Sequence, residues 1–232
     1  MKLDLNKFFR LIEEQPYVVI KPSDILPDYH FGSDIDIFCY NSNKMAELIT
    51  NFLSSYVSGN SEVKIVDNTK KMHIDFMVDG EINLRFDLYK CLPMYKNISI
   101  KSAYFSSSIE GAIKATYPCG VESEELIIKV PSKQDDFILR YIEYHEYYAQ
   151  RPDKIKHIEY IKDKLPKDTV LSALNKLHYY TSFPEPVYIE STRLTKFKSK
   201  LSYYSGLIKV AKKQYKKLSL KEFISKVFSK LR

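Results

Sequence analysis

Two aspartates, Asp34 and Asp36, stand two residues apart in the apolar run 31–38, FGSDIDIF. Side chains of a strand alternate between its faces, so both carboxylates are expected to point the same way. Neighbouring anions repel each other, and a divalent cation is the usual compensation. Gly32 and Ser33 just before them are typical of a tight turn into a strand. The pattern predicts a metal site, and the alternative is a pair of solvated acids on a half-exposed strand.

A predicted hairpin over residues 71–89 places a third acid, Asp87, on the polar face of the sheet. A three-residue loop, 78–80, puts Gly80 in the left-handed position that such loops favour. A two-residue turn would mix polar and apolar side chains on both faces. The three-residue loop sets one apolar row, Met72, Ile74 and Phe76, opposite Phe86, Leu84 and Ile82. It sets one polar row, Lys71, His73 and Asp75, opposite Asp87, Arg85 and Asn83.

Three acids in this arrangement suit a phosphoryl-type transfer assisted by two metal ions. Such ions lie about 3.5–4 Å apart and hold the attacking and leaving oxygens of an in-line displacement. Mg²⁺ takes carboxylates together with substrate phosphates and keeps some of its waters. Asp34 and Asp36 could each reach one ion, while Asp87 could hold the second and accept the proton of the nucleophile.

The segment 32–37, Gly-Ser-Asp-Ile-Asp-Ile, resembles the signature of the nucleotidyltransferase fold, the DNA polymerase β-like superfamily. That signature joins a Gly-Ser turn, an Asp-x-Asp strand and a third acid on a later strand. Residues 15–90 are similar to a minimal branch of this superfamily that occurs in bacterial surface-polysaccharide pathways. The resemblance implies an α+β fold, a nucleotidyltransferase-like mixed sheet with flanking helices, followed here by an all-helical C-terminal half.

The resemblance also implies a function. It assigns Asp34, Asp36 and Asp87 to metal binding, with Mg²⁺ or Mn²⁺ as the cofactor and a nucleoside triphosphate as the donor. The transferred group would be a nucleotidyl or related phosphoryl-type group, and the favoured acceptor a sugar or glycan intermediate. Two alternatives are an antitoxin-like or regulatory binding module with little catalysis and an RNA nucleotidyltransferase.

The chain departs from the family pattern at the turn after the first strand. Ser23 matches that turn, but Pro22 stands where a glycine is usual, and proline has no backbone N–H to offer a phosphate. Lys21 could supply positive charge instead. The departure leaves the donor less certain than the metal ligands.

Six residues are expected around the nucleotide or the metal: Lys21, Ser23, Gly32, Ser33, His73 and Arg85. For His73 the alternative is a cross-strand pair with an acid or with Arg85. Arg85 could neutralise phosphate or pair with a neighbouring acid.

The periodicity predicts a mixed first half. A helix is expected over 3–15, strands over 17–20, 34–40 and 63–66, and a helix from a cap at Ser42 or Asn43 to about Tyr56. Prolines mark an irregular stretch from Tyr89 to about residue 132. Expected domains are 1–130, a helical domain 131–183, and a linker with a basic tail, 184–232.

Helices are predicted over 133–150, 153–164 and 167–180. Their basic and aromatic side chains could close over the nucleotide, or could be ordinary amphipathic packing. The basic set is Arg140, His145, Arg151, Lys154, Lys156 and His157, and the tyrosines are Tyr141, Tyr144, Tyr147, Tyr148 and Tyr160.

Residues 192–232 carry 13 Lys or Arg and one acid, a net charge of +12, whereas the other 191 residues carry −5. This basic tail is predicted to bind an anionic membrane surface or a protein partner. The alternatives are packing with a solvated lysine face and binding to nucleic acid. No signal core or membrane span is apparent. Cys39, Cys91 and Cys119 fit no zinc spacing and are expected to be reduced core thiols. We therefore expect a cytoplasmic protein, in contact with the inner face of the membrane if the tail binds lipid.

Overall fold

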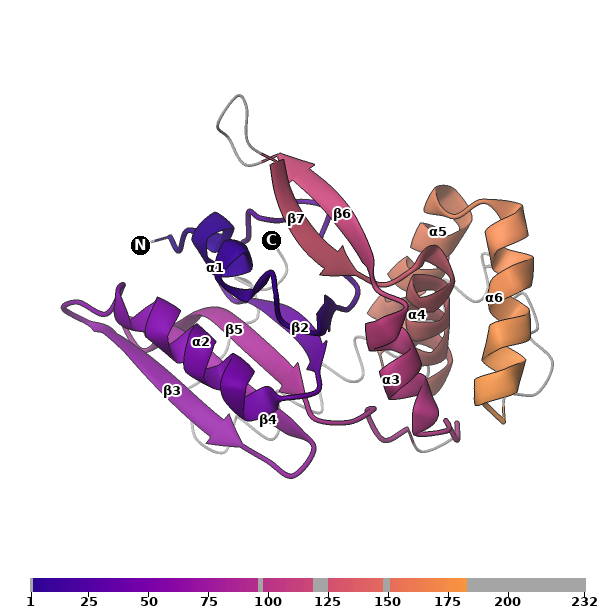
Figure 1. Cartoon of the computed structure of the whole chain (residues 1–232), viewed down its shortest axis with the longest axis horizontal. Coiled ribbons are helices and arrows are strands. Elements are labelled where there is room, and N and C mark those ends of the chain that lie inside the picture. The colour runs from indigo at the N-terminus through magenta and orange to yellow at the C-terminus, as the bar shows by residue number, and fades with distance from the viewer. Residues whose placement is uncertain (1, 96–97, 119–124, 148–150, 183–232) are drawn as a thin grey trace, which may run out of the picture. The chain divides into compact units, whose positions relative to one another are not determined.

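The computed structural model describes residues 2–95, 98–118, 125–147 and 151–182 (Figure 1). Its first part holds two helices and five strands: α1 Leu5–Ile12, β1 Tyr17–Val19, β2 Ser33–Cys39, α2 Ser42–Ser54, β3 Ser61–Asp67, β4 Lys71–Val78 and β5 Glu81–Tyr89. The second part holds α3 Ala103–Glu110, β6 Ile113–Pro118, β7 Glu125–Val130, α4 Lys133–Tyr147, a 3₁₀ turn Pro152–Lys154, α5 Ile155–Lys164 and α6 Lys167–Tyr180.

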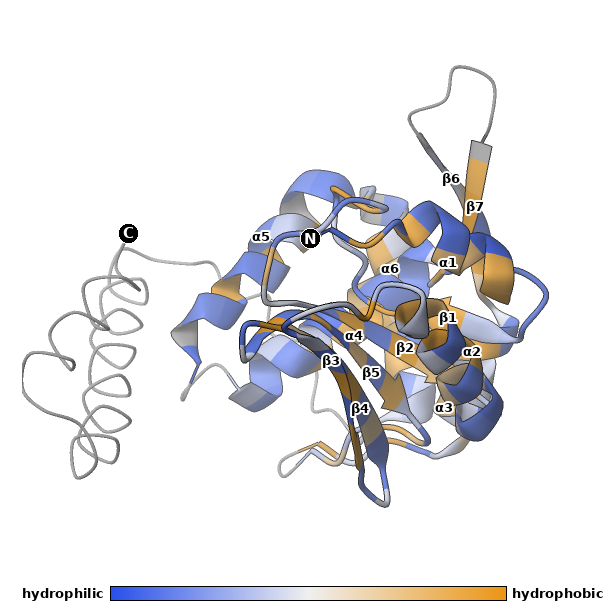
Figure 2. Cartoon of the chain, turned by 90° about the vertical axis from the view of Figure 1, so that its left-hand side faces the viewer, coloured by the Kyte–Doolittle hydropathy of each residue, from blue (hydrophilic) through white to orange (hydrophobic). Residues whose placement is uncertain are grey.

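The first five strands form one mixed sheet in the order β1-β2-β5-β4-β3. The central pair, β2 and β5, is parallel, and every other neighbour is antiparallel. Hydropathy alternates along these strands, as a sheet with one covered face requires (Figure 2). With the helices of residues 133–180, this confirms the predicted α+β class, a mixed sheet with flanking helices and then a helical segment.

Helices α1 and α2 supply the cover of the apolar face. The buried residues of α1, Leu5, Phe8, Phe9 and Ile12, follow helical spacing, and the Asp4 carboxylate caps the helix by accepting from the Asn6 N–H. The Phe8 ring lies 4.8 Å from the ring of Phe86 on β5. This packing leaves the opposite face of the sheet to polar side chains.

The hairpin between β4 and β5 turns through two residues, not the predicted three. Val78 pairs with Glu81, and the turn residues Asp79 and Gly80 have φ of 53° and 78°. Positive φ at both central positions is the requirement of a type I′ turn, which matches the twist of the flanking strands.

A β-bulge explains why the two-residue turn still sorts the faces. Phe76 pairs with Leu84 and Met77 with Ile82, so Asn83 is an extra residue on β5. Beyond the bulge His73 pairs with Asp87, not with Arg85 as predicted. Beyond the bulge the register differs from the prediction by two residues, so the side chains of 71–76 and 84–89 keep their predicted faces. Asn83, predicted on the polar face, is the bulge residue and is buried.

The stretch after Tyr89 is more regular than predicted. It contains α3 and the antiparallel hairpin of β6 and β7. Three alternate residues of β7, Leu126, Ile128 and Val130, join the core cluster of the sheet. The strand pairs with β6 and packs on α1 and β1. Local sequence patterns do not predict such long-range contacts.

Several local predictions need adjustment. The cap of α2 is Asn41, whose side-chain oxygen accepts from the Lys44 N–H at 2.9 Å, not Ser42 or Asn43. Cys39 is buried as expected, but Cys91 is exposed, so its assignment to the core is wrong. Cys119 lies outside the described residues.

Helices α4, α5 and α6 fall where the helical period predicts them. The chain divides into two units, Met1–Arg140 with Leu165–Pro184, and Tyr141–Lys164 with Glu185–Arg232. The predicted domain limits at residues 130 and 183 stay predictions. Among the described residues, no helix is both long and apolar enough to cross a membrane.

Candidate metal centre

The parallel pair β2 and β5 brings the three predicted acids together. Asp36 is the register partner of Asp87, and Asp34 is the partner of Arg85. Each of the three acids offers one carboxylate oxygen, and these oxygens lie within 4.8 Å of one another. Two strands that are distant in sequence thus build one acidic cluster on the polar face of the sheet.

A glycine turn sets the start of β2. Gly32 has φ 78°, a conformation that side chains rarely adopt, and its N–H donates to the Asn83 carbonyl at 2.9 Å. The Ser33 N–H donates to the His30 carbonyl at 3.0 Å. Both contacts fix how β2 enters the sheet beside β5, two residues before Asp34.

Lys21 reaches the cluster from the end of β1. Its Nζ lies 3.2 Å from Asp36 Oδ2, and its backbone has φ 50°. The preceding residue, Ile20, donates its N–H to the Asp36 carbonyl at 2.9 Å. Ser23 is exposed, and its hydroxyl accepts from the Ile25 N–H within its own loop at 3.4 Å. Of the two residues predicted in this turn, the structure places Lys21 at the acids and Ser23 in the neighbouring loop.

Asp87 has both carboxylate oxygens engaged by the protein. The side chain is buried, with 4% of the residue exposed. Lys71 Nζ donates to Oδ2 at 2.7 Å, and His73 Nδ1 lies 2.5 Å from Oδ1. The predicted cross-strand pair of His73 with an acid is therefore present, and the partner is Asp87.

Tyr89 joins the opposite end of the cluster. Its hydroxyl hydrogen-bonds with Asp36, and the Lys71 ammonium lies 4.9 Å from the centre of its ring. Burial, followed by the negative charges of Asp36 and Asp87, raises the pKa of Tyr89. The hydroxyl therefore stays protonated at neutral pH and can donate to the carboxylate.

The environment of Asp36 is balanced between opposing effects. Burial raises the pKa of its carboxyl group most, and the charges of Asp34 and Asp87 raise it further, while Lys21 lowers it. A positive charge at this point would favour the ionised carboxylate. Lys21 supplies part of that charge, and a divalent cation would supply more.

Arg85 pairs with Asp75 rather than standing open on the polar face. Two guanidinium nitrogens donate to the two carboxylate oxygens at 2.6 and 2.7 Å. These hydrogen bonds to Asp75 raise the pKa of Arg85. Of the two readings of Arg85, the structure shows the pair with a neighbouring acid.

The three carboxylates fit a divalent cation with small adjustments. Oxygens on opposite sides of a Mg²⁺ ion are about 4.2 Å apart, because each metal–oxygen distance is about 2.1 Å. The observed limit of 4.8 Å is close enough for side-chain rotation to close the difference. Exposed Asp34 and half-buried Asp36 would be the principal ligands, and Asp87 would share its oxygens with Lys71 and His73.

The basic residues predicted in the helices form local pairs. Arg140 Nε lies 2.8 Å from Asp136 Oδ1 one turn earlier in α4. Lys154 pairs with Glu143, and Arg151 pairs with Asp153 at 2.9 Å. Tyr141 and Tyr144 are buried. These contacts fit the packing alternative, and Tyr148 lies outside the described residues.

Sequence reasoning did not assign Lys71 and Tyr89 to the site. A signal existed, because strand alternation puts both on the same face as Asp87. The pairing of Lys71 with Asp87 is diagonal, since its direct register partner is Tyr89. The predicted register already set Lys71 directly opposite Asp87, whereas its pairing with Tyr89 follows only from the observed register.

Comparison with known proteins adds little detail. No protein-family model matches the chain, and no curated protein sequence matches it. Two solved structures from Helicobacter pylori resemble it, JHP933 and a protein provisionally described as a nucleotidyltransferase, each with a TM-score of 0.41 and 10% identity. The matches cover 89% and 87% of this chain, and 91% and 92% of the others. Likeness at this level carries no argument about function, which must rest on the acids themselves.

Proposed function

We propose that this protein is a metal-dependent transferase of the nucleotidyltransferase type. A nucleoside triphosphate is the proposed donor, and a sugar or glycan intermediate of surface-polysaccharide synthesis is the proposed acceptor. The observation that carries the proposal is the convergence of Asp34, Asp36 and Asp87 from two parallel strands. Grouped carboxylates on a polar sheet face, preceded by a glycine turn, are the arrangement that phosphoryl-type transfer with divalent metals uses.

The proposed reaction joins the acceptor to the α-phosphorus of the donor. An acceptor oxygen forms a new bond to that phosphorus, the bond to the bridging oxygen breaks, and pyrophosphate leaves. Bound Mg²⁺ or Mn²⁺ would neutralise charge on the phosphate oxygens. Asp34 and Asp36 would hold the metal, and Asp87 would take the proton of the acceptor.

Lys21 has a proposed role at the donor phosphates. Its ammonium lies beside Asp36, and it stands next to Pro22, which has no N–H to donate. A side-chain cation would therefore replace part of the backbone contact that a glycine turn provides. The Ser23 hydroxyl accepts from the Ile25 N–H in its own loop, and Ser33 alternates with Asp34 along β2, so neither has a proposed role at the phosphates.

A second candidate function is a binding module with little catalysis. The specific observation in its favour is that Lys21 already contacts Asp36, and Lys71 and His73 already contact Asp87. An acidic cluster that the protein neutralises by itself needs less metal than a bare one. The two candidates differ in turnover and not in fold.

The test is a transfer assay with each labelled nucleoside triphosphate and a panel of sugar phosphates, in Mg²⁺ or Mn²⁺. Asp34→Asn and Asp36→Asn should each lower metal-dependent turnover by about a thousandfold or more, with unchanged unfolding temperature. Asp67→Asn, an exposed acid of β3 paired with Lys90, is the matched control and should retain activity. Full activity in both site variants would refute the proposal. Metal-dependent triphosphate binding without transfer would favour the binding module.

A further inference from the structure

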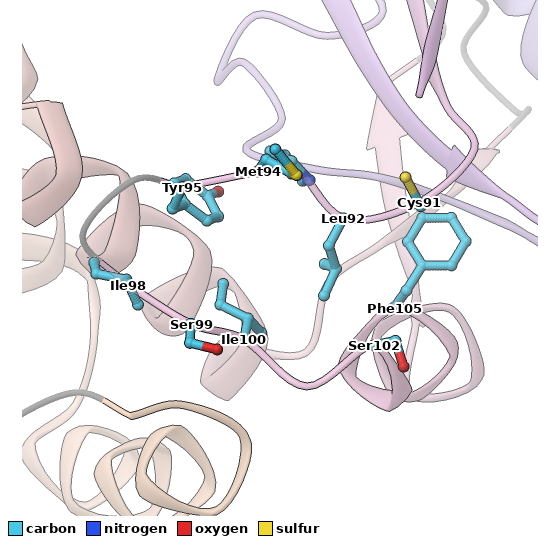
Figure 3. A pocket seen from close by; sticks show the side chains of 10 residues that line it. Cys91, Leu92, Met94, Tyr95, Ile98, Ser99, Ile100, Ser102 and Phe105 are labelled. Carbon is cyan, nitrogen blue, oxygen red and sulfur yellow. The ribbon is translucent and has the colours of Figure 1, made fainter. Parts of the chain in front are cut away.

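A cavity of about 470 Å³ opens beyond the carboxyl end of β5 (Figure 3). The segment after Tyr89 and the start of α3 line it. Six of the lining side chains are apolar: Leu92, Pro93, Met94, Ile98, Ile100 and Phe105. This volume is within the range of small-molecule sites, which are usually apolar with a few placed polar groups.

Among the described residues, which leave out 96 and 97, no charged side chain lines the cavity. Its polar groups are two serine hydroxyls, the Tyr95 hydroxyl and the Cys91 thiol. A nucleobase is usually read through several donors and acceptors on its edge, which this lining offers only sparsely. A hydrocarbon portion of a ligand, by contrast, needs only apolar surface to leave water.

The cavity continues the face of the sheet that carries the acids. Phe38 follows Asp36 by two residues on β2, and Tyr89 follows Asp87 by two residues on β5. Two residues of a strand span about 6.6 Å, and side chains two apart share a face. The rings of Phe38 and Tyr89 are 5.4 Å apart, so the acidic row is followed directly by an aromatic row.

The aromatic row contacts the wall of the cavity. Phe38 packs at 5.0 Å on Phe105, which lines the cavity from α3. The Phe38 ring also lies 5.4 Å from the Tyr89 ring. Tyr89 in turn hydrogen-bonds with Asp36. One row of touching side chains thus connects the metal ligands to the apolar cavity.

We propose that this cavity binds a hydrocarbon portion of the acceptor substrate while the polar end of the same molecule lies at Asp34, Asp36 and Asp87. The inference rests on the proposed transferase function and narrows it, since it makes the acceptor amphipathic. A sugar or phosphate group at one end and a hydrocarbon at the other match the order of acids, aromatic rings and apolar cavity along the sheet.

The test uses alkyl phosphates of increasing length, methyl, butyl, octyl and decyl phosphate, titrated calorimetrically with Mn²⁺ below their micelle concentrations. Each methylene that enters the cavity should tighten binding by up to about fourfold. Decyl phosphate has six more methylenes than butyl phosphate, so it should bind about a hundredfold more tightly if about half of them enter the cavity.

A variant pair controls the location of this effect. Ser102 lines the cavity, is exposed, and makes no capping hydrogen bond through its side chain, so Ser102→Phe should fold and fill the space. Ala103, the next residue, is exposed and does not line the cavity, so Ala103→Phe is the matched control. Ser102→Phe should abolish the chain-length dependence and keep methyl phosphate binding, whereas Ala103→Phe should change neither.

The outcomes separate the two claims. Metal-dependent binding of all phosphates with equal affinity would overturn the cavity inference and leave the transferase proposal standing. Chain-length dependence that survives Ser102→Phe would also overturn it, because the hydrocarbon would then bind elsewhere. No Mn²⁺-dependent binding of any phosphate would count against the transferase proposal, and the amphipathic acceptor would fall with it.

Discussion

Internal cations change how the central acids are understood. From sequence, Asp34 and Asp36 required an external cation, but Lys21 contacts Asp36 and Lys71 contacts Asp87 in the structure. Two ammonium groups thus offset part of the charge of three carboxylates. A divalent ion that shares Asp87 would meet the Lys71 ammonium at close range, with the face of the Tyr89 ring beside it.

Lys71 is therefore predicted to compete with the metal. A unit charge about 5 Å from a divalent ion costs more than 1 kcal/mol even at the dielectric constant of water. Lys71→Met should accordingly tighten Mn²⁺ binding about tenfold or more, measured by calorimetry. Lys44 is exposed on α2 and pairs with Glu47, so Lys44→Met should leave the affinity unchanged. Weaker Mn²⁺ binding by Lys71→Met would show that Lys71 orients Asp87 for the metal instead.

The hairpin of β4 and β5 shows which features of a sheet can be predicted from sequence and which cannot. The alternation of polar and apolar residues predicted which side chains lie on each face of the hairpin. It placed Asp87, His73 and Asp75 on the same face. It could not predict the register, because the shorter turn and the bulge at Asn83 each shift the pairing by one residue in the same direction. The faces survived only because the two changes together shift the pairing by two residues.

Other parts of the fold were out of reach for a different reason. β7 is stabilised by contacts with β6, α1 and β1, and the cavity is lined by a segment without regular structure. Local patterns report periodicity within an element, not which distant elements meet. The acids of β2 were predictable, since a strand and a turn locate them, and the predicted register already set Lys71 opposite Asp87. The place of Tyr89 beside Lys71 needed the true pairing.

The bulge depends on a buried polar contact that can be tested. Asn83 is 1% exposed, and its side-chain oxygen accepts from the Tyr29 hydroxyl at 2.8 Å. The same hydroxyl accepts from the Leu3 N–H at 2.7 Å. Tyr29→Phe removes both of these buried hydrogen bonds and should lower the free energy of unfolding by about 2 kcal/mol in urea titrations.

The control for this variant is Tyr40→Phe. Tyr40 is exposed, and its hydroxyl donates to groups of α3 that water can replace. Its loss should cost less than about 0.5 kcal/mol. Equal costs for Tyr29→Phe and Tyr40→Phe would mean that the bulge does not depend on the buried hydroxyl.

Helix α4 contains a group that should make stability depend on pH. Burial lowers the pKa of His145 to about 4 from an ordinary 6.5, and the Tyr141 and Tyr144 rings lie against it at 4.3 and 5.0 Å. Between these values the unfolded chain binds a proton that the folded helix does not. Stability should therefore fall as pH drops from about 6.5 to 4, by about 2 kcal/mol once partial exposure is discounted.

The measurement is urea unfolding of wild type and His145→Gln at pH 7.5, 6, 5 and 4.5. The variant lacks the titrating ring, so the difference in unfolding free energy between the two proteins should shrink or reverse with falling pH. Parallel pH profiles would show that His145 titrates alike in both states.

At the scale of the whole molecule, charge is concentrated in a part of the chain outside the described residues. The tail 192–232, with its charge of +12, stays a prediction for an anionic membrane surface or a partner. Replacing Lys221, Lys226 and Lys230 by Glu in the full chain should weaken binding to phosphatidylserine vesicles by more than tenfold, because each lysine contributes about 1 kcal/mol. Vesicle sedimentation checks this, with phosphatidylcholine vesicles as the uncharged control. Unchanged sedimentation would favour a protein partner or plain packing.

The central claim is that the acids of β2 and β5 hold a divalent metal for a nucleotide. The most direct measurement is anomalous diffraction from crystals grown with Mn²⁺ and a non-hydrolysable nucleoside triphosphate. The account predicts a Mn²⁺ peak within about 2.2 Å of carboxylate oxygens of Asp34 and Asp36, with triphosphate oxygens completing its ligands. Strong occupancy of the nucleotide elsewhere, with no peak at these acids and Lys21 still paired with Asp36, would contradict it.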